Sequence, residues 1–222
     1  MFDNIAPSYD MLNHLFTLGI DRGWRKKMIR MLAPSGPQSI LDVATGTGDV
    51  AIMTAEMLRP RQVTGIDLSA GMLEIGREKI RKAGLDDIIV LQQGDSENLP
   101  FEEGHFDAVT VAFGVRNFED LKKGLAEMRR VTRPGGIVAI LEFSMPRNRI
   151  LSFFYRLYSK HIMPLIGRIT SGDQAAYTYL FESVQQFPYG DSFINILREV
   201  GFENNSATPL FGGICTIYKS VK

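Results

Sequence analysis

The stretch Leu41-Asp42-Val43-Ala44-Thr45-Gly46-Thr47-Gly48-Asp49 decides the fold of this 222-residue chain. The apolar residues that lead into it predict a buried strand over 39–43, and the residues after Gly48 predict a helix over 49–58. Two glycines between a strand and a helix permit a tight turn, and the first amides of the helix are free to bind a ligand. The turn therefore predicts a nucleoside cofactor site that includes Gly46 and Gly48. The alternative is a simple glycine turn with Asp49 as a helix cap.

The same alternation of strand and helix extends to both sides of this turn. Short apolar runs that are each followed by an amphipathic helix are typical of a parallel sheet with helices on both faces. We expect one domain over residues 1–222, with a doubly wound, Rossmann-like α/β fold of seven mainly parallel strands and an antiparallel last strand. The predicted strands are 39–43, 62–66, 88–92, 106–113, 137–143, 202–207 and 214–218, and the predicted helices are 49–58, 70–83, 119–131, 191–200 and one capped by Asp21.

The composition excludes several classes of protein. Lys+Arg and Asp+Glu number 25 each, so the chain lacks the basic excess of a general nucleic-acid binder. The single cysteine, Cys215, excludes an internal disulfide framework and a cysteine-clustered metal site, and we expect no metal. No apolar run reaches the ~18–20 residues of a spanning helix. Because no secretion signal is visible either, we expect a cytoplasmic protein.

Carboxylates around the glycine turn favour one cofactor over another. In a dinucleotide site a pyrophosphate docks at the helix start, and the third glycine position is here Ala51, which the looser form of that fingerprint permits. Asp49 at the helix start would repel a diphosphate, and Asp42 at the strand end adds a second negative charge. An acidic pocket suits the amino group and sulfonium of S-adenosylmethionine, which is therefore the cofactor that we expect.

Asp67 ends the second predicted strand, 19 residues after Gly48. An acidic residue at about this distance binds the ribose hydroxyls in nucleoside-binding α/β folds. The alternative is that Asp67 caps the following helix, but Ser69 can take that role. Leu68 and Met72 would then offer apolar surface to the adenine.

Polar residues also follow the third and fourth predicted strands. Asp95 can accept a hydrogen bond from the adenine amine, and the backbone of Ser96 can pair with the ring edge. Arg116 and Asn117 place a cation and an amide at the predicted substrate mouth. The alternatives are a polar turn at 95–96 and a helix-capping surface pair at 116–117. The fourth strand end lacks the Asn/Asp-Pro-Pro-aromatic motif of nucleic-acid amino methyltransferases.

Three segments resemble one known family. Residues 1–10 with Asn13, residues 113–117 (Phe-Gly-Val-Arg-Asn), and residues 130–136 with Leu141–Ser144 are similar to the signatures of the ubiquinone/menaquinone-biosynthesis C-methyltransferases of the UbiE/MenG type. The resemblance spans nearly the whole chain, although Ala112 stands where some members carry serine. It implies the class I methyltransferase fold, S-adenosylmethionine as cofactor, and methylation of a ring carbon of a polyprenylated quinol. It also implies that Thr47, Asp67, Asp95 and Ser96 contact the cofactor.

Carbon methylation of a quinol ring requires the loss of a phenolic proton and then of the ring proton. Candidates for this work are Tyr9 and His14 in an N-terminal arm over residues 1–20, which we expect to act as a lid. Arg116, with Asn117 beside it, would stabilise a phenolate. The alternative for His14 is a loop histidine without a catalytic role.

Residues 146–188 interrupt the alternation and are rich in aromatic side chains. We interpret them as a helical insertion over the substrate site that lines a groove for an isoprenoid tail, with Arg156, Lys160 and Arg168 facing anionic lipid at a membrane surface. The alternatives are a helix that caps the core or one that forms a homodimer.

Three functions remain open at this point. A quinol C-methyltransferase is favoured, with a naphthoquinol (demethylmenaquinol) preferred over a benzoquinol. The second function is a methyltransferase for another small molecule, such as a phenol, an amine or a sterol. The third is a non-catalytic nucleoside- or lipid-binding module, against which the polar residues at successive strand ends argue.

Overall fold

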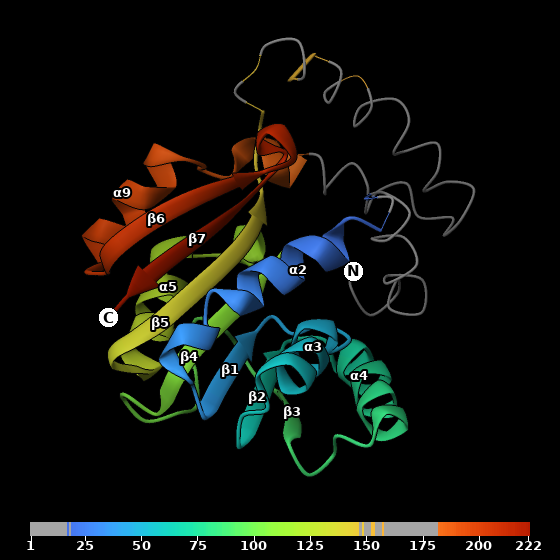
Figure 1. Ribbon diagram of the computed structural model, residues 1–222. Helices are drawn as coiled ribbons and strands as arrows, with labels where there is room; N and C mark the ends of the chain where they lie inside the picture. The colour runs from blue at the N-terminus through green and yellow to red at the C-terminus, as the bar shows by residue number, and fades with distance from the viewer. Residues whose placement is uncertain (1–16, 18, 147, 149–151, 154–156, 158–181) are drawn as a thin grey trace.

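The computed structural model describes residues 17, 19–146, 148, 152–153, 157 and 182–222. Its centre is one seven-stranded sheet with the strand order β3-β2-β1-β4-β5-β7-β6 (Figure 1). Strands β1 to β5 pair in parallel, whereas β7 runs antiparallel to both β5 and β6. This arrangement confirms the predicted Rossmann-like fold and its antiparallel last strand. The strands are β1 (Ser39–Val43), β2 (Gln62–Asp67), β3 (Ile89–Gln93), β4 (Phe106–Ala112), β5 (Thr132–Phe143), β6 (Glu203–Leu210) and β7 (Cys215–Val221).

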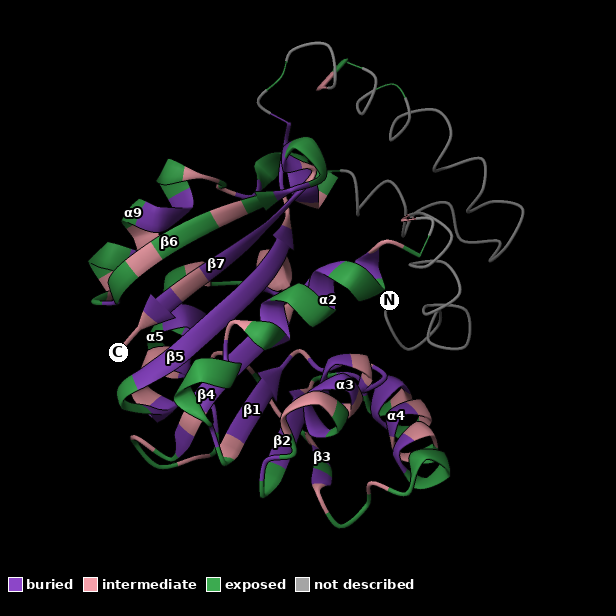
Figure 2. Cartoon of the chain, viewed as in Figure 1, coloured by how far each residue is buried: buried purple, intermediate pink, exposed green. Residues whose placement is uncertain are grey.

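Helices cover both faces of the sheet, so most of its strands are buried (Figure 2). Alternate residues of β1 show the two faces: Ile40 packs in one cluster with Trp24 of α2, and Leu41 packs in another with Leu125 of α5 and Leu197 of α9. A third cluster joins α3 and α4 to β2 and β3. The helices are α2 (Asp21–Arg30), α3 (Asp49–Leu58), α4 (Ala70–Ala83), α5 (Leu121–Val131) and α9 (Asp191–Val200).

Cys215 begins β7 and is fully buried in the cluster that contains Ile40. Burial raises the pKa of its thiol well above the usual value, and the nearby Glu142 carboxylate acts in the same direction. The thiol is therefore protonated and inert at neutral pH.

Several expectations about the ends of elements were wrong, and β2, β3, β4, β6 and β7 also differ from the predicted strands by one to three residues at an end. Asp21 does not cap α2, because the cap residue is Ile20; Asp21 is buried instead, where it accepts a hydrogen bond from Thr17 at 2.8 Å. Helix α5 begins at Leu121 rather than at residue 119, since the Asp120 side chain caps it. Strand β5 begins at Thr132 rather than at residue 137, so residues 133–136 belong to it, and Gly135 and Gly136 pair with Lys222.

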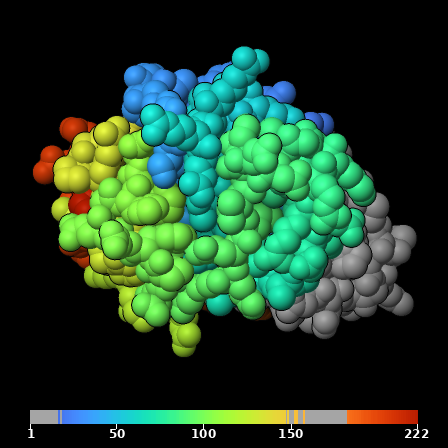
Figure 3. Space-filling model, turned by 90° about the horizontal axis from the view of Figure 1, so that it is seen from below, coloured from blue at the N-terminus to red at the C-terminus, as the bar shows by residue number. Residues whose placement is uncertain are grey.

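Two strands end in backbone conformations that side chains rarely adopt. Ala44 after β1 has φ +50°, and Phe113 after β4 has φ +59°. Gly114 follows Phe113 so closely against the β1 turn that a Cβ on it would lie 2.5 Å from the Ala44 Cβ. These corners shape the carboxyl ends of β1 and β4, where parallel α/β sheets bind ligands. Figure 3 shows the molecule from below, where residues coloured cyan to green cover most of the visible face.

Most of the N-terminal arm (1–20) and of the insertion (146–188) lies outside the described residues. The division into a lid, a core domain and an insertion therefore stays a prediction. Among the described residues, no helix is long and apolar enough to cross a membrane.

Candidate active site

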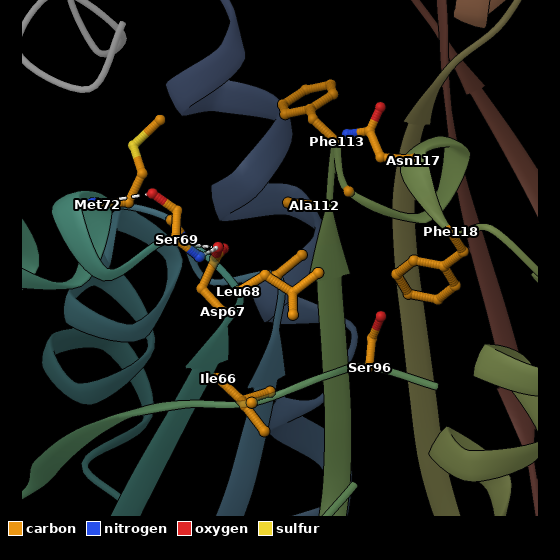
Figure 4. A pocket seen from close by; sticks show the side chains of 14 residues that line it. Ile66, Asp67, Leu68, Ser69, Met72, Ser96, Ala112, Phe113, Asn117 and Phe118 are labelled. Atoms are coloured by element: carbon orange, nitrogen blue, oxygen red, sulfur yellow. Dashed lines mark hydrogen bonds between the residues drawn. The ribbon is translucent and has the colours of Figure 1, made fainter. Parts of the chain in front are cut away.

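A cavity of about 250 Å³ opens at the carboxyl ends of β1, β2 and β4 (Figure 4). In Figure 4, Asp67, Ser69 and Met72 approach it from one side, and Ser96, Phe118 and Asn117 from the other. The sheet topology alone explains this meeting, since the ends of parallel strands share one edge. The lining residues are Ala44, Gly46, Ile66, Asp67, Leu68, Ser69, Met72, Gly94, Ser96, Ala112, Phe113, Gly114, Asn117 and Phe118.

The Asp67 carboxylate is held rigidly at the rim of this cavity. Its Oδ2 accepts from the Gly46 amide at 2.8 Å, and its Oδ1 accepts from the Ser69 amide at 2.9 Å. Ser69 takes the cap of α4, where its hydroxyl accepts from the Met72 amide at 3.2 Å. A carboxylate offers about four acceptor sites, so Asp67 can accept from more donors than these two amides.

Apolar groups form the walls around Asp67. Met72 is buried and Phe118 half-buried, whereas Leu68 is 65% exposed at the mouth. Ser96 lines the cavity, but the neighbouring Asp95 is exposed and does not; its Oδ1 accepts from the Glu97 amide at 2.8 Å. A flat apolar ring such as adenine suits the space between these walls.

A second, smaller cavity of about 30 Å³ adjoins the first and shares Ala44, Gly46 and Ala112 with it. Its remaining lining comes from α2, β1, the glycine turn and α3, namely Arg25, Asp42, Thr45, Thr47, Asp49 and Val50. The predicted cofactor residues Asp42 and Thr47 thus lie beside this smaller cavity, whereas Gly46 lies beside both. Gly48 lines neither cavity and caps α3 with φ +79°.

Asp42 is fully buried beneath the small cavity. Its Oδ2 accepts from the Thr45 hydroxyl at 2.6 Å and its Oδ1 from the Thr110 hydroxyl at 2.7 Å. Burial raises the pKa of this carboxyl to about 6, against the opposing effect of the two hydrogen bonds.

Asp49 differs from the sequence-based expectation, because its charge is already neutralised. It pairs with Arg25 at 2.8 Å and with Lys79 of α4, which also donates to the Thr47 hydroxyl at 3.2 Å. Burial disfavours the charged carboxylate, but Lys79 and Arg25 outweigh that effect and lower the pKa of Asp49. The pocket is therefore less acidic than expected, and repulsion by Asp49 does not by itself exclude a diphosphate.

Arg116 and Asn117 are neighbours on a short 3₁₀ turn, η2 (Val115–Asn117), yet their environments differ. Asn117 lines the main cavity, whereas Arg116 lies outside that lining and pairs with the buried Glu142 at 2.8 Å. The Arg116 guanidinium also donates to the Phe113 carbonyl at 2.5 Å. The other two predicted catalytic residues, Tyr9 and His14, lie outside the described residues.

Sequence reasoning missed three charged residues near the site, Arg25, Lys79 and Glu142. Arg25 follows Asp21 by four positions on α2, a spacing that predicts their ion pair. Its contact with Asp49 depends on how α2 packs against α3, which no local pattern reveals. Glu142 stands in the strand-end segment that resembles the family, but nothing in the sequence pairs it with Arg116.

Comparisons with known proteins agree with this geometry. The ubiE/COQ5 methyltransferase family matches residues 1–222. A protein of Bacteroides fragilis named demethylmenaquinone methyltransferase is 48% identical over all of this chain and 91% of its own length. A protein of Geotalea daltonii named ubiquinone/menaquinone biosynthesis C-methyltransferase UbiE is 44% identical over all of this chain and 94% of its own length.

Solved structures share the fold at low sequence identity. A putative S-adenosyl-L-methionine-dependent methyltransferase of Methanococcus maripaludis has a TM-score of 0.68 and 22% identity, covering all of this chain and 94% of that one. Phosphoethanolamine N-methyltransferase 2 of Haemonchus contortus, solved with S-adenosyl-L-methionine, has a TM-score of 0.65 and 17% identity, covering 88% of this chain and 52% of that one. The family match over the full length confirms the resemblance seen in the sequence, and the chain belongs to the ubiE/COQ5 methyltransferase family.

Proposed function

We propose that this protein transfers a methyl group from S-adenosylmethionine to a ring carbon of a polyprenylated quinol, with demethylmenaquinol as its preferred substrate. Membership of the family supports the reaction class. The names of relatives at 45–48% identity support the naphthoquinol. The observation that carries the proposal is the cavity at the ends of β1, β2 and β4, with the Asp67 carboxylate fixed at its rim.

The residues of the two cavities fit this cofactor. Asp67 would accept from both ribose hydroxyls, and Leu68, Met72 and Phe118 would enclose the adenine. The small cavity beyond Ala44 has room for the charged groups of an amino acid but not for a second nucleotide. This difference in size favours S-adenosylmethionine over a dinucleotide more strongly than the charge of Asp49 does.

The order of these subsites locates the reacting centre. When bound, the cofactor supplies an activated methyl group on its sulfonium, so no metal is required. With the nucleoside at Asp67 and the amino acid in the small cavity, the residues that the two cavities share, Ala44, Gly46 and Ala112, would hold the sulfonium end of the cofactor. Phe113 and Asn117 are the nearest candidates to hold the quinol ring in line with the methyl group.

Arg116, which lies outside the lining of the main cavity, is the candidate to stabilise a phenolate. One buried N–H of its guanidinium, on Nε, has no hydrogen-bond partner among the described residues. Glu142 holds the guanidinium in place, so any ring oxygen that Arg116 contacts would meet a donor that is already oriented.

Tyr9 and His14 remain the candidates for proton transfer, through an arm that closes over the ring. Histidine side chains ordinarily titrate near neutral pH, so the role proposed for His14 is tested by the pH dependence of turnover. A His14→Ala enzyme that keeps its turnover unchanged across pH 6–9 would remove His14 from the mechanism.

The insertion is proposed to hold the isoprenoid tail and to touch a membrane surface. A tail-less quinol should then show a raised KM, and binding to vesicles with anionic lipid should weaken as salt is raised. An unchanged KM would instead favour a helix that caps the core or forms a dimer, and the molecular mass in solution separates those two.

The decisive experiment supplies purified protein with S-adenosylmethionine and a reduced short-tail demethylmenaquinol, with a demethylated benzoquinol in parallel. Mass spectrometry then reports methyl gain on each ring. Gain on the naphthoquinol carbon is expected. Cofactor binding without methylation of either quinol would contradict the proposal and favour another small-molecule substrate.

A further inference from the structure

The loop after β3, residues 94–101 (the β3 loop), contains neither helix nor strand, yet it forms part of the main cavity. Gly94 and Ser96 of this loop line the cavity, and Figure 4 shows Ser96 across the cavity from Asp67. The Ser96 amide donates to no acceptor among the described residues. Because no regular element holds the loop in place, contacts with neighbouring elements must set its position.

Two charged side chains of α5 hold the far end of the β3 loop. The Glu127 carboxylate accepts from the Leu99 amide at 2.8 Å. The Arg130 guanidinium donates to the carbonyl of Leu99 at 2.9 Å and to that of Phe101 at 2.7 Å. The amide and the carbonyl of Leu99 are therefore both bonded to a charged group, and such bonds are stronger than those between neutral groups.

Glu127 and Arg130 also bind each other. Two nitrogens of the guanidinium donate to the two carboxylate oxygens, at 2.7 and 2.8 Å. These bonds lower the pKa of Glu127 and raise that of Arg130, so both groups stay charged at neutral pH. Only a planar guanidinium can bond a carboxylate through two nitrogens and still reach two carbonyls, and a lysine ammonium cannot replace it in this geometry.

Two further contacts of the same helix support this wall of the cavity. The Asp120 amide, at the cap of α5, donates to the Glu97 carboxylate of the loop at 2.9 Å. A Cβ on Gly124 would lie 2.4 Å from the Phe118 ring, so α5 packs closely against that side chain. Phe118 lines the cavity beside Ser96, whereas no residue of α5 does. The wall opposite Asp67 is thus positioned by a helix that does not itself touch the cavity.

We propose that Glu127 and Arg130 are positioning residues, which hold the β3 loop where the Ser96 amide can donate to the edge of the adenine ring. They thereby make the site select adenine over other purines. Nitrogen N1 of adenine accepts a hydrogen bond, whereas N1 of hypoxanthine carries a hydrogen and would face the amide donor to donor. The inference rests on the cofactor named in the proposed function, but not on its quinol substrate.

A purely structural role makes a different prediction. The Leu99 side chain is only 3% exposed and belongs to the core cluster that contains Leu41, so loss of its backbone partners also lowers stability. Lower stability alone weakens the binding of every ligand by the same factor. A misplaced loop weakens only the binding of the base for which the loop is placed.

Calorimetric titration with two nucleosides separates these roles. S-adenosylhomocysteine carries adenine, and S-inosylhomocysteine is the same molecule with hypoxanthine; competition against the first measures the second where it binds weakly. The wild type should prefer adenine by about 10-fold or more. In Arg130→Lys, we expect the affinity for S-adenosylhomocysteine to fall about 5- to 20-fold and that for S-inosylhomocysteine to change less than about 2-fold.

The matched control is the neighbouring residue of the same helix. Arg129 donates to the Gly201 carbonyl at 3.0 Å, away from the cavity. Arg129→Lys removes the same kind of bond and should leave both affinities unchanged. The titrations are repeated in Glu127→Gln, with thermal unfolding recorded for each variant, and this milder change decides the question if Arg130→Lys does not fold.

Each outcome bears on the inference. A narrowed preference for adenine in Arg130→Lys and Glu127→Gln supports it. Equal losses for both nucleosides, an unchanged affinity for S-adenosylhomocysteine, or a wild type without preference between the two bases would overturn it while leaving the proposed reaction untouched. If the wild type binds neither nucleoside, the inference and the proposed cofactor fail together. If the preference narrows as expected but no quinol is methylated, only the proposed substrate fails.

Discussion

Arg116 and Glu142 form a buried ion pair that links the turn after β4 to the end of β5. The two side chains are 6% and 0% exposed, and the Arg116 nitrogen lies 2.8 Å from the Glu142 oxygen. Glu142 also accepts from the amides of Arg116 and Phe143, at 3.3 and 2.8 Å. One carboxylate therefore fixes both the backbone and the side chain of the residue beside the proposed substrate site.

Removal of this carboxylate should be costly to stability. Glu142→Gln leaves the buried Arg116 charge without its partner, and we expect the free energy of unfolding to fall by about 3–5 kcal/mol. Urea unfolding measures the change. The control is Glu199→Gln, which breaks the exposed Lys122–Glu199 pair and should leave the free energy of unfolding almost unchanged. A similar decrease in the free energy of unfolding in the two variants would show that the buried Arg116–Glu142 pair stabilises the protein no more than an exposed ion pair does.

Asp67→Asn should weaken nucleoside binding whether or not the ligand has an amino-acid end. The amide retains only one acceptor atom, so one ribose hydroxyl and one of the Gly46 and Ser69 amides lose their best partner. We expect S-adenosylhomocysteine and 5′-methylthioadenosine to lose affinity together, by about 10- to 100-fold, as measured by calorimetry. Asp86→Asn, at an exposed position, is the control. A loss confined to S-adenosylhomocysteine would contradict the ribose role.

The buried carboxyl of Asp42 should make the free energy of unfolding depend on pH. Its pKa rises from 3.8 to about 6 on folding, chiefly through burial, so the folded protein holds this proton more tightly than the unfolded chain does. The resulting stabilisation is full below pH 3.8 and is lost as the pH rises through about 6. Across that window the wild type should lose about 3 kcal/mol relative to Asp42→Asn. Urea unfolding of both proteins at several pH values tests this, and parallel stability curves would exclude a raised pKa.

Two glycines offer a matched test of packing at the site. A Cβ on Gly114 would lie 2.5 Å from the Ala44 Cβ, so Gly114→Ala should push apart the two turns beneath the cavity. We expect it to lower both stability and nucleoside affinity. Gly23 lies on α2, and apart from the backbone of its own helix and its two chain neighbours, no atom of the described residues comes within 4 Å of the place that a Cβ on it would take. Gly23→Ala should therefore stabilise the protein by about 0.5–1 kcal/mol. Urea unfolding measures the stability of both variants, and calorimetry measures their affinity for the nucleoside. An unchanged nucleoside affinity in Gly114→Ala would show that the two turns can move apart without affecting the cavity.

Local patterns in the sequence predicted the elements that carry a strong signal. The α3 and α4 helices begin and end at the predicted residues, because Gly48 and Ser69 mark their starts and Gly84 ends α4. The extension of β5 through Pro134 could not be predicted in this way. That segment is held by the chain terminus at Lys222, far along the sequence, and its own residues favour a turn.

The same distinction between local patterns and long-range contacts applies to the residues of the candidate site. Asp67 could be predicted because its role depends on spacing within one strand–helix–strand unit. The pairing of Arg25 with Asp49 and of Arg116 with Glu142 depends on which elements become neighbours in space. The sequence alone does not reveal which charged residues form ion pairs across elements. For this reason the glycine turn was expected to be more acidic than it is.

The buried thiol of Cys215 has a practical consequence. Since it is the chain's only cysteine and its raised pKa keeps it unreactive, the wild-type protein has no fast-reacting thiol. A cysteine introduced at the exposed Leu68 would then react alone with a fluorescent maleimide. Such a label would sit at the mouth of the nucleoside cavity and report its filling as a change in emission, on a background free of competing sites.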